Sequence, residues 1–149
     1  MLFRSIKTIK FCDELLLKKL AKFVELKEYI TEKKKEIGLD NKKLKINQED
    51  LVASGLTNVG LFRQYIFNYL KDHKGIRDDL TFLIRQLQPG QSGLPIEIYV
   101  FTNDTDWVNY ENIQSDIFDH LLAVLPAFDL SAFQIISDNN DQVKRIKDK

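Results

Sequence analysis

The stretch TFLIRQLQPGQSGLPIEIYVFT, residues 81–102, decides the fold of this chain. Two segments rich in β-branched and aromatic residues, 81–88 and 96–102, flank a turn at 89–93 that contains proline and two glycines. We therefore predict two antiparallel strands joined as a hairpin.

Side chains of the second strand alternate between the two faces of the predicted sheet. One face carries Ile96, Ile98 and Val100 and suits a core, whereas the other carries Glu97, Tyr99 and Phe101. Exposed aromatic sheet surface usually marks a contact with another domain or subunit, so we expect Tyr99 and Phe101 to lie outward.

A helix is predicted before the hairpin, over residues 58–73. Its apolar side chains recur at three- and four-residue steps, Thr57 is a suitable N-cap, and Gly75 is expected to close the helix. The apolar residues of this stripe are Phe62, Tyr65, Ile66, Tyr69 and Leu70.

A longer helix is predicted after the hairpin, from Trp107 to Leu125, where apolar residues again recur at helical spacing. Asn103 and Asp104 are helix-capping types that precede it. A tryptophan at the start of such a stripe is more often core than interface. Residues 132–137 are expected to form a last strand.

The N-terminal part combines a strand-like segment, residues 3–10, with helical periodicity from Asp13 to Ile37. We predict one broken helix or two short ones there. The lysine-rich tract 33–45 also contains acidic residues, so a solvated helix end and linker, with Gly38 as its C-cap, is favoured over a phosphate-binding patch.

The order strand, helix, strand, strand, helix, strand predicts an α+β fold, a ferredoxin-like βαββαβ sandwich with an additional N-terminal helical segment. Four regions are expected. They are the end of a preceding strand region (1–12), a helical insertion and linker (13–50), the ferredoxin-like domain (51–137) and a charged tail (138–149).

Composition narrows the class of function. The 149 residues include 44% hydrophobic and 30% charged residues, typical of a globular protein, and 22 basic residues balance 22 acidic ones. This balance gives no electrostatic steering toward nucleic acid. The single Cys12 suits a reducing compartment. No apolar run approaches the length of a membrane span, and the N-terminus lacks the apolar core of a signal peptide.

Reactive chemistry is not indicated. His73 and His120 lie on different predicted helices, which favours two unrelated histidines over a metal site. Cys12 has no histidine near it in sequence, and the acidic pair 78–79 reads as a solvated turn. Residues 103–106 contain only part of a calcium-loop pattern, so helix capping explains them better. We expect no enzyme activity, no cofactor and no metal.

Several segments, in the same order and with similar spacing, carry a family resemblance. They are LTNVGLFR (56–63), IRDDLT (76–81), LIRQL (83–87), GLPIEIY (93–99), FTNDT (101–105), Trp107 and DIFDH (116–120). Together they closely resemble the C-terminal cytoplasmic region of YbdG-like, miniconductance-type mechanosensitive channels of the MscS family. The resemblance runs from about Ser5 to Gln134.

The resemblance implies that the full protein is a homo-oligomer, a heptamer as in the family, in the bacterial inner membrane. This region would lie on the cytoplasmic side as part of a vestibule that filters solutes and holds subunits together during osmotic stress. The membrane-spanning segments and the pore helix would precede Arg4. No nucleic-acid partner is expected.

The resemblance also supplies motif positions with a possible interface role: Asn58, Arg63, Arg85, Gln86, Tyr99, Phe101, Asn103, Asp104, Trp107 and Asp119. For Arg63 and Arg85 a subunit contact is one interpretation. For Arg85, a strand residue that extends to the rim of the sheet is the other.

A different class of function stays open, namely a free-standing ligand- or RNA-binding module, because ferredoxin-like sheets can stack bases on exposed aromatic residues. Tyr99 and Phe101 fit this idea. The absence of a basic-glycine-aromatic signature in the strand and the balanced charge oppose it.

Overall fold

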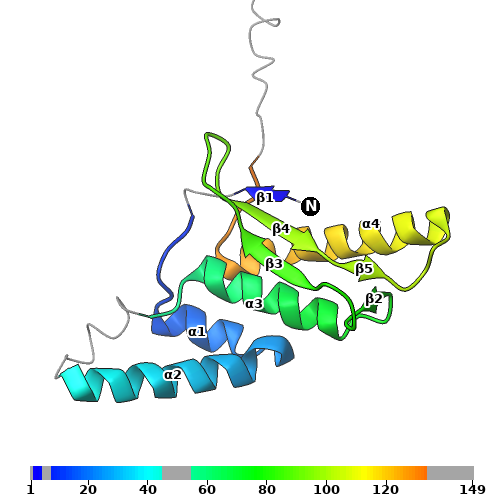
Figure 1. Cartoon of the computed structure of the whole chain (residues 1–149). Coiled ribbons are helices and arrows are strands. Elements are labelled where there is room, and N and C mark those ends of the chain that lie inside the picture. The colour runs from blue at the N-terminus through cyan, green and yellow to red at the C-terminus, as the bar shows by residue number, and fades with distance from the viewer. Residues whose placement is uncertain (1, 5–7, 45–54, 134–149) are drawn as a thin grey trace, which may run out of the picture.

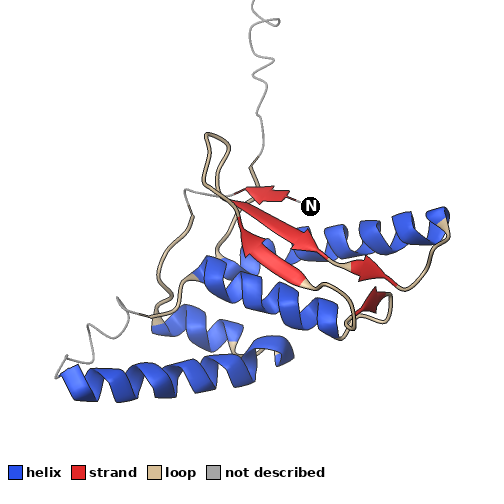
Figure 2. Cartoon of the chain, viewed as in Figure 1, coloured by secondary structure: helices blue, strands red, loops and turns tan. Residues whose placement is uncertain are grey.

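The computed structural model describes residues 2–4, 8–44 and 55–133. Helices and strands alternate irregularly along the chain (Figures 1 and 2). In order, they are β1 (Leu2–Arg4), α1 (Glu14–Leu20), α2 (Val24–Leu44), α3 (Asn58–Lys71), β2 (Ile76–Arg77), β3 (Leu83–Gln86), β4 (Pro95–Tyr99), β5 (Phe101–Thr102), α4 (Trp107–Val124) and the 3-10 helix η1 (Leu125–Phe128).

The predicted hairpin is confirmed. Strands β3 and β4 pair antiparallel, with Leu83 opposite Tyr99 and Gln86 opposite Ile96. Strand β1 pairs with the other edge of β4, which gives a three-stranded sheet in the order β1-β4-β3. The turn is closed by reciprocal hydrogen bonds between the backbones of Gly90 and Gly93. Gly93 has φ 113°, which only glycine adopts without strain.

The second predicted strand is interrupted in the structure. It ends at Tyr99, and after Val100 the chain continues as β5, which pairs with β2 in a separate two-stranded sheet. Val100 is the point at which the chain leaves one sheet for the other. The predicted alternation is nevertheless confirmed, because Ile96 is buried and Ile98 packs against the core.

The α+β class is confirmed, but the complete ferredoxin-like sandwich is not shown. Of the last strand predicted over residues 132–137, Ala132 and Phe133 lie outside regular structure and the remainder lies outside the described residues. The charged tail, 138–149, also lies outside them.

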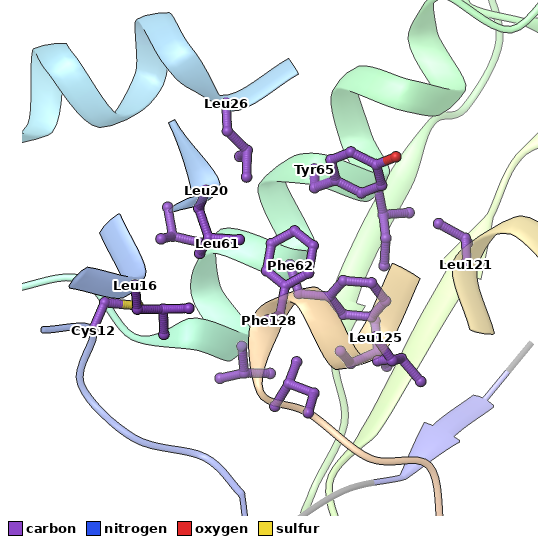
Figure 3. Close-up of a cluster of buried hydrophobic side chains, with 14 of the residues drawn as sticks. Cys12, Leu16, Leu20, Leu26, Leu61, Phe62, Tyr65, Leu121, Leu125 and Phe128 are labelled. Carbon is purple, nitrogen blue, oxygen red and sulfur yellow. The ribbon is translucent and has the colours of Figure 1, made fainter. Parts of the chain in front are cut away.

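One hydrophobic core joins the N-terminal helices to the rest of the domain (Figure 3). Helix α3 lies between the sheet and the α1–α2 pair (Figure 1). Aromatic rings fill its centre: Phe128 packs edge-on against Phe62 with ring centroids 5.2 Å apart, and Tyr65 lies 5.5 Å from Phe128. Leu20, Leu26 and Leu61, which surround them, are fully buried.

Two helices form in the N-terminal region, as predicted by one of the two interpretations, but only α1 is short, because α2 spans 21 residues and extends to Leu44. The chain turns at residues 21–23, and Phe23 inserts its ring beside Tyr65 and Phe128. The prediction that Gly38 caps the helix is wrong, because α2 continues through this glycine to Leu44. A Cβ placed at Gly38 would have no neighbouring atom within 4 Å in the described part of the chain. No other described element therefore packs against the helix at this residue.

Helix α3 begins as predicted. The Thr57 hydroxyl accepts a hydrogen bond from the Gly60 backbone N–H at 3.1 Å, which confirms the N-cap. The helix ends at Lys71, before the predicted residue 73, and Asp72 rather than Gly75 provides the C-cap.

Helix α4 confirms one prediction in part and corrects another. Its N-cap is Asp106, whose carboxylate accepts hydrogen bonds from the backbone N–H groups of Val108 and Asn109. This confirms the capping interpretation of residues 103–106, although neither Asn103 nor Asp104 caps the helix directly. The interpretation of Trp107 as a core residue is wrong, because its side chain is 72% exposed. The buried residues of α4, Ile117 and Leu121, lie in its second half, and Ile113 packs against the core from the first half.

Candidate functional site

Exposed aromatic side chains cover the outer face of the β4–β5 ribbon. Tyr99 is 49% exposed and Phe101 is 41% exposed. Their rings meet edge to face with centroids 5.6 Å apart. Because the helices pack on the opposite face, this pair points away from the core, as the alternation predicts.

A second apolar surface lies at the start of α4. Trp107 and Val108 are 72% and 63% exposed, and the Trp107 ring lies 5.9 Å from that of Tyr110. Asp104 rigidifies this end, because its carboxylate accepts from the Asp106 N–H and from Asn109 Nδ2, both at 2.8 Å. The exposed tryptophan is therefore held on an ordered helix start rather than on a loop.

An apolar groove with a volume of about 120 Å³ lies between the inner side of the strands and α4. Ile98 and Val100 line it from the sheet side, and Tyr110 and Ile113 line it from α4. The first half of α4 therefore does not close fully onto the sheet, and apolar side chains remain accessible on both walls.

Asn103 holds the loop between β5 and α4 to the loop after α3. Its backbone N–H donates to the Gly75 carbonyl at 3.0 Å, and its Nδ2 donates to the Lys74 carbonyl. Asn103 and Asp104 therefore position the helix start that presents Trp107. The sequence predicted both residues as helix-capping types and, from the family resemblance, as possible interface positions, but it did not indicate this positioning role.

Two of the motif arginines differ in their surroundings. Arg85 forms an ion pair with Glu97, which lies directly opposite on β4, and its side chain is 54% exposed. Gln86 follows it on the edge strand and is exposed. Arg63 projects from α3, is exposed and forms no ion pair within the described part of the chain.

Asn58 has no exposed surface and acts inside the subunit. Its Nδ2 donates to the carbonyls of Thr8 at 2.7 Å and Phe128 at 3.0 Å, and its Oδ1 accepts from the Lys10 N–H at 3.0 Å. One side chain thus ties the N-terminal segment, α3 and η1 together. A direct contact to another subunit is not available to it.

The two histidines belong to one aromatic cluster, so the prediction that they are unrelated is wrong. His120 stacks on Tyr69 with centroids 4.1 Å apart, and His73 meets the same ring edge-on at 5.8 Å. His120 Nε2 and the Tyr65 hydroxyl share a hydrogen bond of 2.6 Å. Burial, followed by the nearby charge of Glu25, raises the pKa of Tyr65 to about 12, so its hydroxyl stays protonated.

Cys12 is an inert core residue. It is 2% exposed, and burial, followed by the charge of Asp13, raises the pKa of its thiol to about 11. The nucleophilic thiolate is therefore rare at neutral pH. Over residues 2–4, 8–44 and 55–133, no three His, Cys, Asp or Glu side chains gather in an arrangement that could hold a metal ion.

A surface depression with a volume of about 480 Å³ lies elsewhere, between α2 and α3. Glu25, Glu28, Tyr29 and Glu32 line it from α2, and Asp72 lines it at the end of α3. The carboxylates in this depression face solvent, and no arrangement among the described residues indicates a ligand.

Charge is segregated along the chain, although the total is zero. Residues 1–85 carry 18 basic and 12 acidic side chains, whereas residues 86–143 carry nine acidic side chains and no lysine or arginine. The whole-chain balance conceals this difference. A regional count of charges could have revealed it from the sequence.

An ordered α+β scaffold with two exposed aromatic surfaces is typical of a domain that makes contacts within an assembly. Among the described residues, none of the helices combines the length and the apolar composition that crossing a membrane requires.

The family model for the C-terminal region of the mechanosensitive ion channel MscS matches residues 6–132. The chain therefore belongs to this family, which confirms the MscS part of the resemblance. The family is one of oligomeric channels and not of enzymes. No solved structure matches the chain.

Proposed function

We propose that this chain forms part of the cytoplasmic vestibule of a YbdG-like, miniconductance-type channel in the bacterial inner membrane. It contributes to the assembly of a homo-heptamer and to the filtering of solutes that leave the cell during osmotic stress. Membrane-spanning segments outside this sequence supply the pore. The ferredoxin-like arrangement belongs to the same proposal, supported by the antiparallel order β1-β4-β3.

Exposure of aromatic side chains on ordered elements is the observation that carries the assembly role. Tyr99, Phe101 and Trp107 all project from regular structure and expose more than 40% of their surface. Aromatic residues are enriched in subunit interfaces because they bury large areas with little loss of side-chain entropy. Family membership supplies the oligomeric context.

The roles of the motif positions follow their placement. The exposed residues Arg63, Gln86 and Asp119 are proposed as interface residues, together with the three aromatic residues. Arg85 forms an ion pair with Glu97 and so holds the side chains of the outer sheet face in place. Asn58, Asn103 and Asp104 act within the subunit by holding these surfaces in place.

The test uses the full-length gene product in a bacterial strain that lacks its own mechanosensitive channels. We expect the wild-type protein to rescue survival after an osmotic downshock and to give tension-gated currents in membrane patches. The double variant Tyr99→Ala, Trp107→Ala should yield smaller complexes on size-exclusion chromatography with light scattering and less rescue. Comparison of currents carried by small and large anions tests the filtering.

Val24→Ala is the matched control, because Val24 is an 88% exposed apolar residue on a different helix. It should leave complex size and rescue unchanged. A wild-type protein that gives neither tension-gated current nor rescue contradicts the proposed function. If the double variant forms complexes of unchanged size, the aromatic surfaces are not part of the subunit interface.

A further inference from the structure

The outward surface of α4 combines apolar and acidic side chains without any basic residue. Val108, Asp116, Asp119 and Leu122 follow one another at steps of eight, three and three residues, so they lie on one side of the helix, and all four are exposed. We call this set the α4 acidic face. Neither aspartate forms an ion pair in the described part of the chain.

The outward surface of α1 has the opposite character. Leu15 is 81% exposed, and Lys18, Lys19 and Lys22 follow it at three, four and seven residues, which places all four on one side of the helix and the turn after it. We call this set the α1 basic face. The three lysines form no ion pair with any described residue, whereas Leu16, Leu17 and Leu20 on the opposite side are buried.

The two faces do not pair with each other within the described part of one subunit. In Figure 1, α1 lies at the lower left of the molecule, whereas α4 begins at the right edge and extends toward the centre. In the described part of the chain, no ion pair joins the lysines of the α1 basic face to the aspartates of the α4 acidic face. Each face therefore exposes an apolar side chain among charges that are mostly of one sign, and the two signs are opposite. Such complementarity steers association and fixes the relative orientation of the partners.

We propose that the α1 basic face of one subunit docks on the α4 acidic face of a second copy of this chain. A head-to-tail contact between two different surfaces of identical subunits generates a ring when the rotation closes. This inference rests on the proposed function, because it names the surfaces through which the oligomer closes. Leu15 and Leu122 supply the apolar contact, and the lysines and aspartates surround it.

Second copies fit this contact better than an unrelated protein because both halves are present on every subunit. A contact of this kind depends on salt, since partly exposed charges are screened over about 8 to 10 Å at physiological ionic strength. The apolar centre retains part of the affinity in high salt.

Charge reversal with compensation tests the proposal in the full-length protein. We expect the pair Lys18→Glu, Lys22→Glu and the pair Asp116→Lys, Asp119→Lys each to weaken subunit association by about tenfold or more, because like charges then face each other. All four substitutions together should restore association to within about threefold of wild type, because opposite charges face each other again. Light scattering of the purified complex gives the assembled fraction.

Lys27→Glu and Asp78→Lys are the matched controls, because both residues are exposed, lie outside the two faces and form no ion pair among the described residues. They should leave the assembled fraction unchanged. Far-UV circular dichroism and melting of every variant separate loss of assembly from loss of folding.

Cross-linking gives an independent readout. In a Cys12→Ser background, the variant with Leu15→Cys and Leu122→Cys should form disulfide-linked dimers and higher multiples of the subunit mass on mild oxidation. A cross-linked product whose mass is not a multiple of the subunit overturns the choice of a second copy as the partner.

The outcomes separate the two proposals. If the wild-type complex assembles, but the cross-link does not form or the fourfold variant is no better than either pair alone, the docking of α1 on α4 is wrong and the vestibule function stands. If the wild-type protein does not assemble at all, the proposed function is wrong and this contact falls with it.

Discussion

Helix α3 and the first half of α4 carry the same kind of apolar periodicity, yet the protein uses them in opposite ways. Helix α3 buries Phe62, Tyr65 and Leu70 completely or almost completely. The start of α4 leaves Trp107 and Val108 largely exposed. Periodicity therefore shows that a helix has an apolar side, and the surrounding elements decide whether that side meets the same subunit or another surface.

The largest effect should come from the buried helix. Phe62→Ala removes a side chain with no exposed surface from the aromatic centre beside Phe128, so we expect a loss of about 3 to 5 kcal/mol in the free energy of unfolding. Urea denaturation followed by circular dichroism measures it. Phe67→Ala is the control on the same helix, because Phe67 is 36% exposed, and it should cost about 1 kcal/mol.

An intermediate effect is expected at the first residue of α3. Asn58→Ala removes the Nδ2 donor from the carbonyl groups of Thr8 and Phe128, and the bond to Phe128 is buried, so we expect a loss of about 2 to 3 kcal/mol in unfolding free energy. Asn58→Asp is the informative comparison, because it keeps an acceptor for the Lys10 N–H and loses both donors. A fully stable alanine variant would show that the clamp contributes nothing to the fold.

The smallest effect on stability is expected at the start of α4. Trp107→Ala should change the free energy of unfolding of this chain by less than about 0.5 kcal/mol, because the ring is 72% exposed. The same denaturation measurement applies. A loss comparable to that of Phe62→Ala would show that Trp107 is buried in solution and would remove the contrast between the two helices.

Local features were predictable where the chemistry that produces them is local. The hairpin was found because Pro89, Gly90 and Gly93 allow a turn between two β-rich segments. The N-cap at Thr57 was found because a hydroxyl can reach the N–H group three residues later. The outward position of Tyr99 and Phe101 followed from strand alternation alone.

The failed predictions share a dependence on neighbours distant in the sequence or on competing local options. Gly38 has the chemistry of a C-cap, yet the solvated α2 helix passes through it. Four polar residues, 103–106, precede α4; capping was predicted for this group, but only the final backbone geometry selects Asp106 as the cap. His73 and His120 meet at Tyr69 because α3 and α4 pack together, which no local pattern indicates.

By itself, the sequence determined the α+β class, the hairpin, most helix positions and the family motifs, because propensity, alternation and spacing act over a few residues. Only the tertiary structure decided that Asn58 is a buried clamp, that Trp107 is exposed, and that the basic face of α1 and the acidic face of α4 form no ion pair with each other in the described part of the chain. The physical reason is that burial and charge pairing depend on which elements pack together, and that is set by long-range contacts that no local pattern contains.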